Sequence, residues 1–105
     1  MNLCSFTGFL TKDPELTQNE GVSRVEFVLV TYTYRTTKST GEKSRIPTFI
    51  NCEAWHTGAE TIYNLFKKGS KMHVHASAKN PRKGSHEIIF RINEFDSADH
   101  TEEEN

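Results

Sequence analysis

The sequence predicts an all-β domain with one short helix, in which three strands precede the helix and two strands follow it. Three observations support this prediction. Several stretches alternate between apolar and polar side chains, as strands with one buried face do. Only the stretch near residues 57–68 has apolar residues at helical spacing. Turn-forming Gly, Pro and Asn residues separate these stretches. A chain of 105 residues is long enough for one domain with a modest core.

The first strand is predicted over residues 3–10. One face of this strand carries the side chains that we assign to the core, which are Cys4, Phe6, Gly8 and Leu10. A glycine inside a strand indicates a bend or a close approach of another backbone. Asp13-Pro14 ends the strand, because proline cannot donate to a strand ladder, and Asn19-Glu20-Gly21 forms a second turn.

A long second strand is predicted over residues 22–35, which are rich in β-branched and aromatic side chains. Because this length is unusual for a strand, we expect strong curvature or a bulge. Tyr32 and Tyr34 near its end lie beside Arg35, so aromatic rings and a positive charge occur together there. Residues 36–45 are polar and are predicted to form a basic hairpin loop. The cations of this region are Arg35, Lys38, Lys43 and Arg45. They suit contacts with phosphates, although an ordinary solvated loop would have the same composition.

The third strand is predicted from Pro47 to Trp55. Its core face consists of Ile50, Cys52 and Ala54. Its other face consists of Phe49, Asn51, Glu53 and Trp55. Two large aromatic rings on the second face have two explanations: they are buried in a second layer or subunit contact, or they are a stacking platform for flat ligands such as nucleic-acid bases. Glu53 lies between them as a spacer or as a partner for a nearby Arg or Lys.

The helix is predicted after His56. Thr57 precedes Glu60 by three residues, which fits a capping box, and Gly69 is a stop signal. The last two strands are predicted over residues 71–79 and 86–95, with a short basic turn between them. This order of elements is that of the OB-fold, a five-stranded Greek-key barrel whose helix lies between strands three and four.

The charge of the chain is unevenly distributed. The net charge is −1, but residues 96–105 contain five acidic residues and no Lys or Arg. Residues 1–95 therefore contain 13 basic and 9 acidic residues, a net charge of +4. We interpret residues 1–95 as the folded domain and residues 96–105 as an acidic tail. A basic domain with an acidic tail suits a protein that binds a polyanion, and a solubilising terminus explains the tail equally well.

No apolar run approaches membrane-spanning length and the start has no signal-peptide character, so we expect a cytoplasmic protein without membrane contact. Cys4 and Cys52 are too few for a disulfide framework and are expected to be free, buried thiols.

Four stretches contain combinations of residues that are specific to one family. They are Asn2-Leu3 with Gly8-Phe9-Leu10-Thr11-Lys12-Asp13-Pro14-Glu15-Leu16, Gly21 with Phe27-Val28-Leu29-Val30, Thr48-Phe49-Ile50-Asn51-Cys52-Glu53-Ala54-Trp55, and Ala59-Glu60 with Leu65-Phe66-Lys67-Lys68-Gly69-Ser70. In these stretches the chain resembles the bacterial-type single-stranded DNA-binding proteins, which have an OB-fold, over nearly the whole domain.

The resemblance implies sequence-independent binding of single-stranded DNA, which protects it during replication, recombination and repair. Phe49 and Trp55 match base-stacking aromatics of the family by position. The DNA-binding residues that we predict are Phe9, Tyr32, Tyr34, Arg35, Lys38, Lys43, Arg45, Phe49, Asn51, Trp55, His73, His75, Lys79 and Arg91. The resemblance also implies a homo-oligomer, either a dimer or a tetramer, and replication or recombination partners that contact the acidic tail.

Three departures from the family pattern are expected to matter. Phe9 stands where many relatives have arginine, and the turn near residues 80–85 is shorter than the long hairpin of many members. The tail has neither a long linker nor the terminal Pro-Phe through which relatives recruit partners. The shorter turn puts the family's usual tetramer in doubt, and the different tail puts its usual partner contacts in doubt. A compact chain of this kind suits a phage-encoded protein as well as a bacterial one.

Other functions have weaker support in the sequence. His73 and His75 lie on one strand face, but a metal site needs a third ligand, so we expect surface histidines and no metal or cofactor. No serine elbow, phosphate loop or paired carboxylates indicate an enzyme. The alternative that remains is an OB-fold interaction module that binds protein or RNA and uses its aromatic face as a subunit interface.

Overall fold

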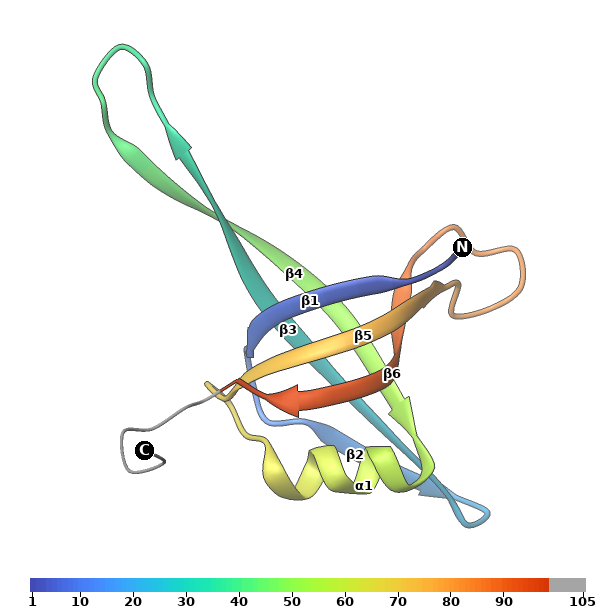
Figure 1. Cartoon of the computed structure of the whole chain (residues 1–105). Helices are drawn as coiled ribbons and strands as arrows, with labels where there is room; N and C mark the ends of the chain where they lie inside the picture. Colours follow the sequence, from blue (N-terminus) through green and yellow to red (C-terminus); the bar gives the residue numbers. More distant parts are fainter. Residues whose placement is uncertain (99–105) are drawn as a thin grey trace.

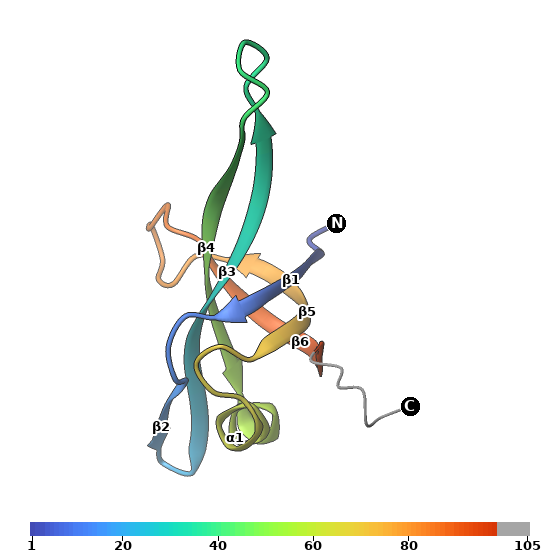
Figure 2. The ribbon, with the colours of Figure 1, turned by 90° about the vertical axis from the view of Figure 1, so that its left-hand side faces the viewer.

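The chain folds into a closed β-barrel from which a long two-stranded arm projects (Figure 1). The computed structural model describes residues 1–98. Its elements are β1 (Cys4–Leu10), β2 (Glu15–Asn19), β3 (Val22–Thr36), β4 (Lys43–Trp55), α1 (His56–Leu65), β5 (Lys71–Lys79) and β6 (Ile89–Ser97). Figure 2 shows that the arm and α1 lie at opposite ends of the molecule.

The barrel closes through five strands. β1 pairs antiparallel with β5 and, at Phe9 and Leu10, with β3. β3 pairs antiparallel with β4, β4 pairs parallel with β6, and β6 returns antiparallel to β5. With α1 between β4 and β5, this is the predicted OB-fold.

β2 is a sixth strand that the sequence analysis missed. It pairs antiparallel with the first part of β3, from Val22 to Glu26, and so extends the sheet beside β1. Leu16 is its single apolar residue, and the strand has none of the alternation that identifies a half-buried strand from sequence. Its pairing with β3, rather than its own side chains, makes it a strand.

The core lies inside the barrel and is closed at one end by the helix. The predicted core face of β4 is confirmed, since Ile50, Cys52 and Ala54 are all buried. The helix contributes the buried residues Ala59 and Ile62. The other buried members of the core cluster are Leu10, Val25, Phe27, Leu29, Phe66, Met72 and Val74. Each of the barrel strands β1, β3 and β5 thus turns alternate apolar residues inward.

β6 contains a bulge that changes which residues face the core. His75 pairs with Glu94 and Ala76 pairs with Ile92, so Asn93 is an extra residue without a partner in the ladder. Because of this extra residue, Ile92 and Phe95 both pack against the core although they are three positions apart. A strict alternation would have turned one of them to the solvent.

The ends of β6 differ from the predicted strand. It begins at Ile89 rather than at residue 86, and it continues through Asp96 to Ser97. Ala98 is buried and its backbone N–H donates to the carbonyl of Lys71 over 2.9 Å. Residues 96–98, which we assigned to the acidic tail, therefore pack against the barrel. The remainder of that segment, residues 99–105, lies outside the described residues.

The length of β3 produces a projecting arm and not a bulge. The β3–β4 ladder is regular from the Arg24–Trp55 pair to the Thr36–Lys43 pair. Residues 31–48, which we call the arm, extend beyond the contacts with β1 and β6. The predicted loop 36–45 was too long, because the turn comprises only residues 37–42 and is closed by Thr37 N–H donating to Glu42 over 2.8 Å. Strand pairing satisfies the backbone of a polar segment that has no buried face.

The helix begins without the predicted capping box. Trp55 is its N-cap residue and makes no side-chain capping hydrogen bond, so β4 runs directly into α1. Thr57 lies inside the first turn, and Glu60 instead accepts a hydrogen bond of 2.7 Å from the Ser23 hydroxyl. The helix ends at Leu65, before the predicted stop at Gly69.

The two cysteines are free thiols, as expected. Cys52 is buried in the core, and burial raises the pKa of its thiol to about 12. Cys4 is half-buried at the start of β1, less enclosed than predicted. Within residues 1–98, no helix is both long and apolar enough to cross a membrane.

A substitution at Gly8 tests how the barrel closes. A Cβ at this position would lie 2.7 Å from the Val30 carbonyl oxygen, so β1 and β3 would have to separate. We expect Gly8→Ala to lower the free energy of unfolding by about 1–3 kcal/mol, measured by urea denaturation.

Gly58→Ala is the matched control. A Cβ at this helical position would lie at an ordinary 3.8 Å from the Phe95 ring. This variant should be neutral or more stable by about 0.5–1 kcal/mol, because alanine favours a helix over glycine. Equal stability of the two variants would contradict a tight contact at Gly8.

Candidate nucleic-acid interface

The side chains of β3 and β4 that point away from the core form one continuous surface, which we call the outer face. Strand residues alternate in direction, so directly paired residues lie on the same side of the sheet. The pairs on the outer face, from the helix end to the arm, are Arg24–Trp55, Glu26–Glu53, Val28–Asn51, Val30–Phe49, Tyr32–Pro47, Tyr34–Arg45 and Thr36–Lys43. Most of the aromatic and basic DNA-binding residues that we predict on β3 and β4 therefore lie on the outer face.

An apolar strip crosses the middle of this face. Phe49 pairs with Val30, and Val30 is also the register partner of Phe9 on β1. Phe49 is 64% exposed and Phe9 is 39% exposed, while Val30 between them is buried. Lys71 on β5 lies beyond Phe9, with its ammonium 5.7 Å from the ring centroid. The strip therefore offers two rings to a ligand and has a cation at one end.

The arm adds cations to this face. Lys43 and Arg45 lie on the same side of the ribbon as Phe49, and the Arg45 guanidinium stacks 4.0 Å from the centroid of the Tyr32 ring. Tyr34 is mostly exposed beside Arg45. Arg35 pairs with Ser44 on the opposite side of the ribbon, and Lys38 lies in the turn at the tip. Within the arm the one acidic residue is Glu42.

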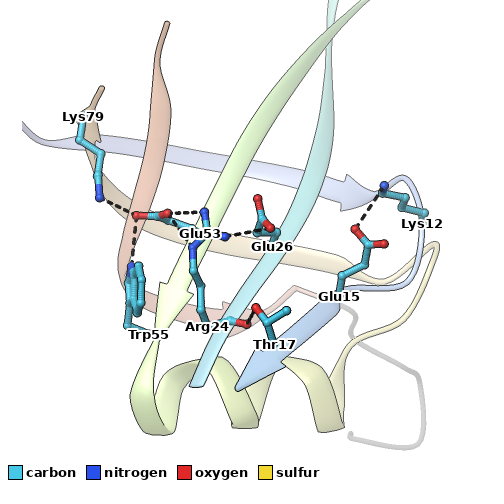
Figure 3. Close-up of polar contacts among 8 residues, drawn as sticks. All are labelled: Lys12, Glu15, Thr17, Arg24, Glu26, Glu53, Trp55 and Lys79. Atoms are coloured by element: carbon cyan, nitrogen blue, oxygen red, sulfur yellow. Dashed lines mark hydrogen bonds and ion pairs between the residues drawn. The ribbon is translucent and has the colours of Figure 1, made fainter. Parts of the chain in front are cut away.

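Glu53 is a buried carboxylate on the outer face, with 2% of its surface exposed. Arg24 donates to its Oε1 from Nε over 3.2 Å and from Nη2 over 2.9 Å. Lys79 Nζ donates to Oε2 over 2.9 Å, and Trp55 Nε1 donates to the same oxygen over 3.1 Å (Figure 3). Glu53 is thus a partner of Arg and Lys, one of the two roles that the sequence left open.

These contacts decide the ionisation of Glu53. Burial alone would raise the pKa of the carboxyl group, but hydrogen bonds from Lys79, Arg24 and Trp55 outweigh it and hold the pKa below its ordinary value. On the other side, the Arg24 guanidinium also pairs with Glu26 over 2.9 Å. Two cations and two carboxylates therefore meet beside Trp55.

Trp55 occupies the end of the outer face next to α1. Its ring is half-buried, and the Arg24 guanidinium lies 5.5 Å from its centroid. Two open hollows adjoin the ring: one of about 500 Å³ that β2 also lines, and one of about 540 Å³ lined in part by Lys79 and Arg91. Trp55 lies six positions along the strand from Phe49, which corresponds to roughly 20 Å. The two rings would therefore contact different bases.

Three further predicted DNA-binding residues, Asn51, Lys79 and Arg91, lie on or beside the outer face. Arg91 is exposed and is the register partner of Glu53, so it lies near Trp55. Asn51 is exposed between the two rings, two residues from Phe49 and four from Trp55. Lys79 reaches the same region but its ammonium is bound by Glu53.

His73 and His75 lie apart from the outer face, on β5. Their rings hydrogen-bond to Thr7 over 2.5 Å and to Ser5 over 2.8 Å. Their register partners on β6 are the acidic residues Asp96 and Glu94. This carboxylate-rich setting does not favour a phosphate backbone. In the part of the chain that the structure describes, no group of three or more His, Cys, Asp and Glu residues could hold a metal ion.

Sequence reasoning missed Arg24 and Lys71. Arg24 lies in the apolar pattern of β3, and Lys71, the first residue of β5, follows Lys67 and Lys68 in a basic stretch that the sequence assigns to the end of the helix. Only the strand register shows that Arg24 faces Trp55 and that Lys71 faces Phe9.

A five-stranded barrel with one helix between β4 and β5 places the chain among OB-fold proteins. The model of the single-strand binding protein family matches residues 1–87. The chain therefore belongs to the single-strand binding protein family.

Two curated relatives are similar in sequence. The chain is 36% identical over 70 residues to single-stranded DNA-binding protein A of Bacillus subtilis (strain 168). The matched region covers 67% of this chain and 40% of that protein. It is 42% identical over 72 residues to single-stranded DNA-binding protein 2 of Listeria monocytogenes serovar 1/2a (strain ATCC BAA-679 / EGD-e), covering 67% of this chain and 42% of that protein. The matched region spans about two fifths of the length of these relatives.

Solved structures share the fold at lower identity. The crystal structure of wild-type single-stranded DNA binding protein from Thermus aquaticus superposes with a TM-score of 0.77 at 18% identity, over 94% of this chain and 50% of that chain. A deletion mutant of the same protein gives a TM-score of 0.77 at 19% identity, over 94% of this chain and 51% of that chain. These similarities establish the barrel fold.

The stability of the protein should depend on pH through Glu53. Its folded pKa lies below the ordinary value of 4.5, so its contribution is complete above about pH 4.5 and disappears as the pH falls through the folded pKa. We expect Glu53→Gln to lower the free energy of unfolding at pH 7 by roughly 1–3 kcal/mol, and the difference from wild type to shrink in acid.

Glu26→Gln is the control for this measurement, because Glu26 pairs with the same arginine but its side chain is 49% exposed. It should cost less than about 1 kcal/mol. Urea denaturation between pH 3 and pH 7 measures both variants. A Glu53→Gln difference that stays constant with pH would contradict the role of the ionised carboxylate.

Proposed function

We propose that this domain binds single-stranded DNA without sequence preference, by stacking bases on the outer face and pairing phosphates with the arm. The observation that carries the proposal is the exposed ring of Phe49, flanked by Phe9 and continuous with the cations of the arm. A stacked base contributes roughly 1–3 kcal/mol and needs only an aromatic surface, which explains indifference to sequence. The names of the two curated relatives agree with this activity.

We also propose a biological role for the protein, which follows from its family. The protein would protect single-stranded DNA during replication, recombination and repair in the cytoplasm of a bacterium, encoded by the host or by a phage. It would act as a homo-oligomer, either a dimer or a tetramer, and as a binding protein rather than an enzyme. The acidic residues at the end of the chain would contact other replication or recombination proteins.

Phe49→Ala tests the stacking platform. Phe49 is exposed and its ring lies outside the core, so the variant should fold normally and bind oligo-dT roughly tenfold to hundredfold more weakly, the loss of one stacked base. Binding is measured by fluorescence anisotropy of a labelled oligonucleotide. Leu65→Ala is the control, since Leu65 is 68% exposed but lies on α1, away from the outer face. Equal effects of the two substitutions would contradict the proposed platform.

Charge reversal in the arm tests the phosphate contacts. Lys43→Glu and Lys38→Glu should each weaken binding at low salt and reduce the slope of log K against log salt concentration by roughly 0.7 for each phosphate contact that is lost. Lys67→Glu is the control, because Lys67 follows α1 at the opposite end of the molecule. An unchanged slope in both arm variants would show that the arm does not contact DNA.

A second candidate is an OB-fold module for protein or RNA in which the aromatic strip is an interface between subunits. The observation in its favour is again the exposed apolar surface of Phe49 and Phe9, which suits a protein contact. Sedimentation equilibrium distinguishes the two candidates. Under the first, Phe49→Ala binds DNA weakly and keeps the mass of the wild type. Under the second, the same substitution dissociates the oligomer, and wild-type Trp55 fluorescence is not quenched by oligo-dT.

A further inference from the structure

The most unusual group on the outer face is the Glu53 carboxylate. It is buried on a surface that we propose to receive a polyanion, where a negative charge is unfavourable for binding. Its two oxygens accept four hydrogen bonds, from Arg24, Lys79 and Trp55. A buried carboxylate is stable only when such donors replace its water.

The first consequence concerns the orientation of Trp55. A hydrogen bond of 3.1 Å from Nε1 to Glu53 holds one edge of the indole, and the Arg24 guanidinium lies 5.5 Å from its centroid. Glu53 also holds that guanidinium through two hydrogen bonds, so it fixes Trp55 both directly and through Arg24. A ring held in this way is preorganised for stacking, because its freedom is already lost before a base arrives.

The second consequence concerns charge. Arg24 and Lys79 are the cations nearest to Glu53, and both are paired with it at 2.9 Å. Glu26 pairs with Arg24 as well. These two cations and two carboxylates sum to no net charge. In the arm, by contrast, Arg35, Lys38, Lys43 and Arg45 are accompanied by Glu42 as the one acidic residue.

We infer that Glu53 is the positioning residue of a stacking site at Trp55, where it orients the indole for a base and keeps Arg24 and Lys79 from pairing with phosphates. This inference rests on the proposed function. The two ends of the outer face then bind differently. The Trp55 end contributes mainly stacking, with Arg91 as an exposed cation nearby, and the arm contributes most of the phosphate contacts that make binding depend on salt.

The test compares Glu53→Met, Glu53→Gln and Lys79→Met with the control Glu26→Gln. Trp55 is the single tryptophan of the chain, so its time-resolved fluorescence anisotropy in the free protein reports the mobility of this ring alone. The salt dependence of oligo-dT binding is the second measurement. Glu26→Gln changes the same charge beside the same arginine but does not touch Trp55.

We expect Glu53→Met to make the Trp55 ring more mobile and to steepen the slope of log K against log salt by roughly 0.7, because Lys79 loses its pair with Glu53 and can meet a phosphate, whereas Arg24 keeps its pair with Glu26. Glu53→Gln should steepen the slope while the amide oxygen still accepts the indole N–H, so the ring should stay closer to wild type. Lys79→Met and Glu26→Gln should leave the slope unchanged within error.

Two results would overturn the inference: an indole that is equally mobile in wild type and Glu53→Met, or a Lys79→Met slope that falls as far as that of Lys43→Glu. If Glu53→Met does not fold, as judged by circular dichroism, the slopes of Glu53→Gln and Lys79→Met decide the question. Absence of oligo-dT binding by the wild type would refute the proposed function instead, and the anisotropy of the free protein would still show whether Glu53 positions Trp55.

Discussion

The regular antiparallel pairing of β3 with β4 is the constraint on which the rest of the structure depends. It runs without a bulge from Arg24–Trp55 to Thr36–Lys43, so every second residue of each strand keeps the same side. On one side this places Phe27, Leu29 and Ile50 in the core. A slip of one residue would exchange the core with the outer face, and burial of the apolar set excludes that slip.

The same pairing accounts for the arm. β1 pairs with β3 at Leu29 and Val30, and β6 pairs with β4 at Cys52 and Glu53. Neither pairing extends past Val30 toward the tip, so β3 and β4 continue beyond the barrel. In the arm neither side has a core to cover, and the sequence there is accordingly polar and threonine-rich. The connection between β5 and β6 adds no second ribbon of this kind, since Asn80 ties it to the Glu87 carbonyl close to the strand ends. The arm is therefore the one ribbon that projects from the described part of the chain, and it carries the exposed cations Arg35, Lys38, Lys43 and Arg45.

The Glu53 cluster shows how a polar group becomes part of the framework. Removing a carboxylate from water costs several kcal/mol, and the attraction of Arg24 and Lys79 offsets this only because the geometry satisfies both oxygens. The cluster joins β3, β4 and β5 across the outside of the barrel. It thereby connects the stability of the fold to the orientation of Trp55, the residue at the boundary between strand and helix.

Elements whose signal is local are predictable from the amino-acid sequence. Alternation identified the core faces of β1 and β4, the order of elements identified the OB-fold, and the same alternation placed Phe49 outward. Only the tertiary structure decided β2, the bulge at Asn93 and the start of α1, because each depends on a neighbouring strand rather than on its own residues. The partners of Glu53 are 29 and 26 positions away in the chain, at Arg24 and Lys79. Periodicity reports the direction of a side chain, whereas the register between distant strands decides what it meets there.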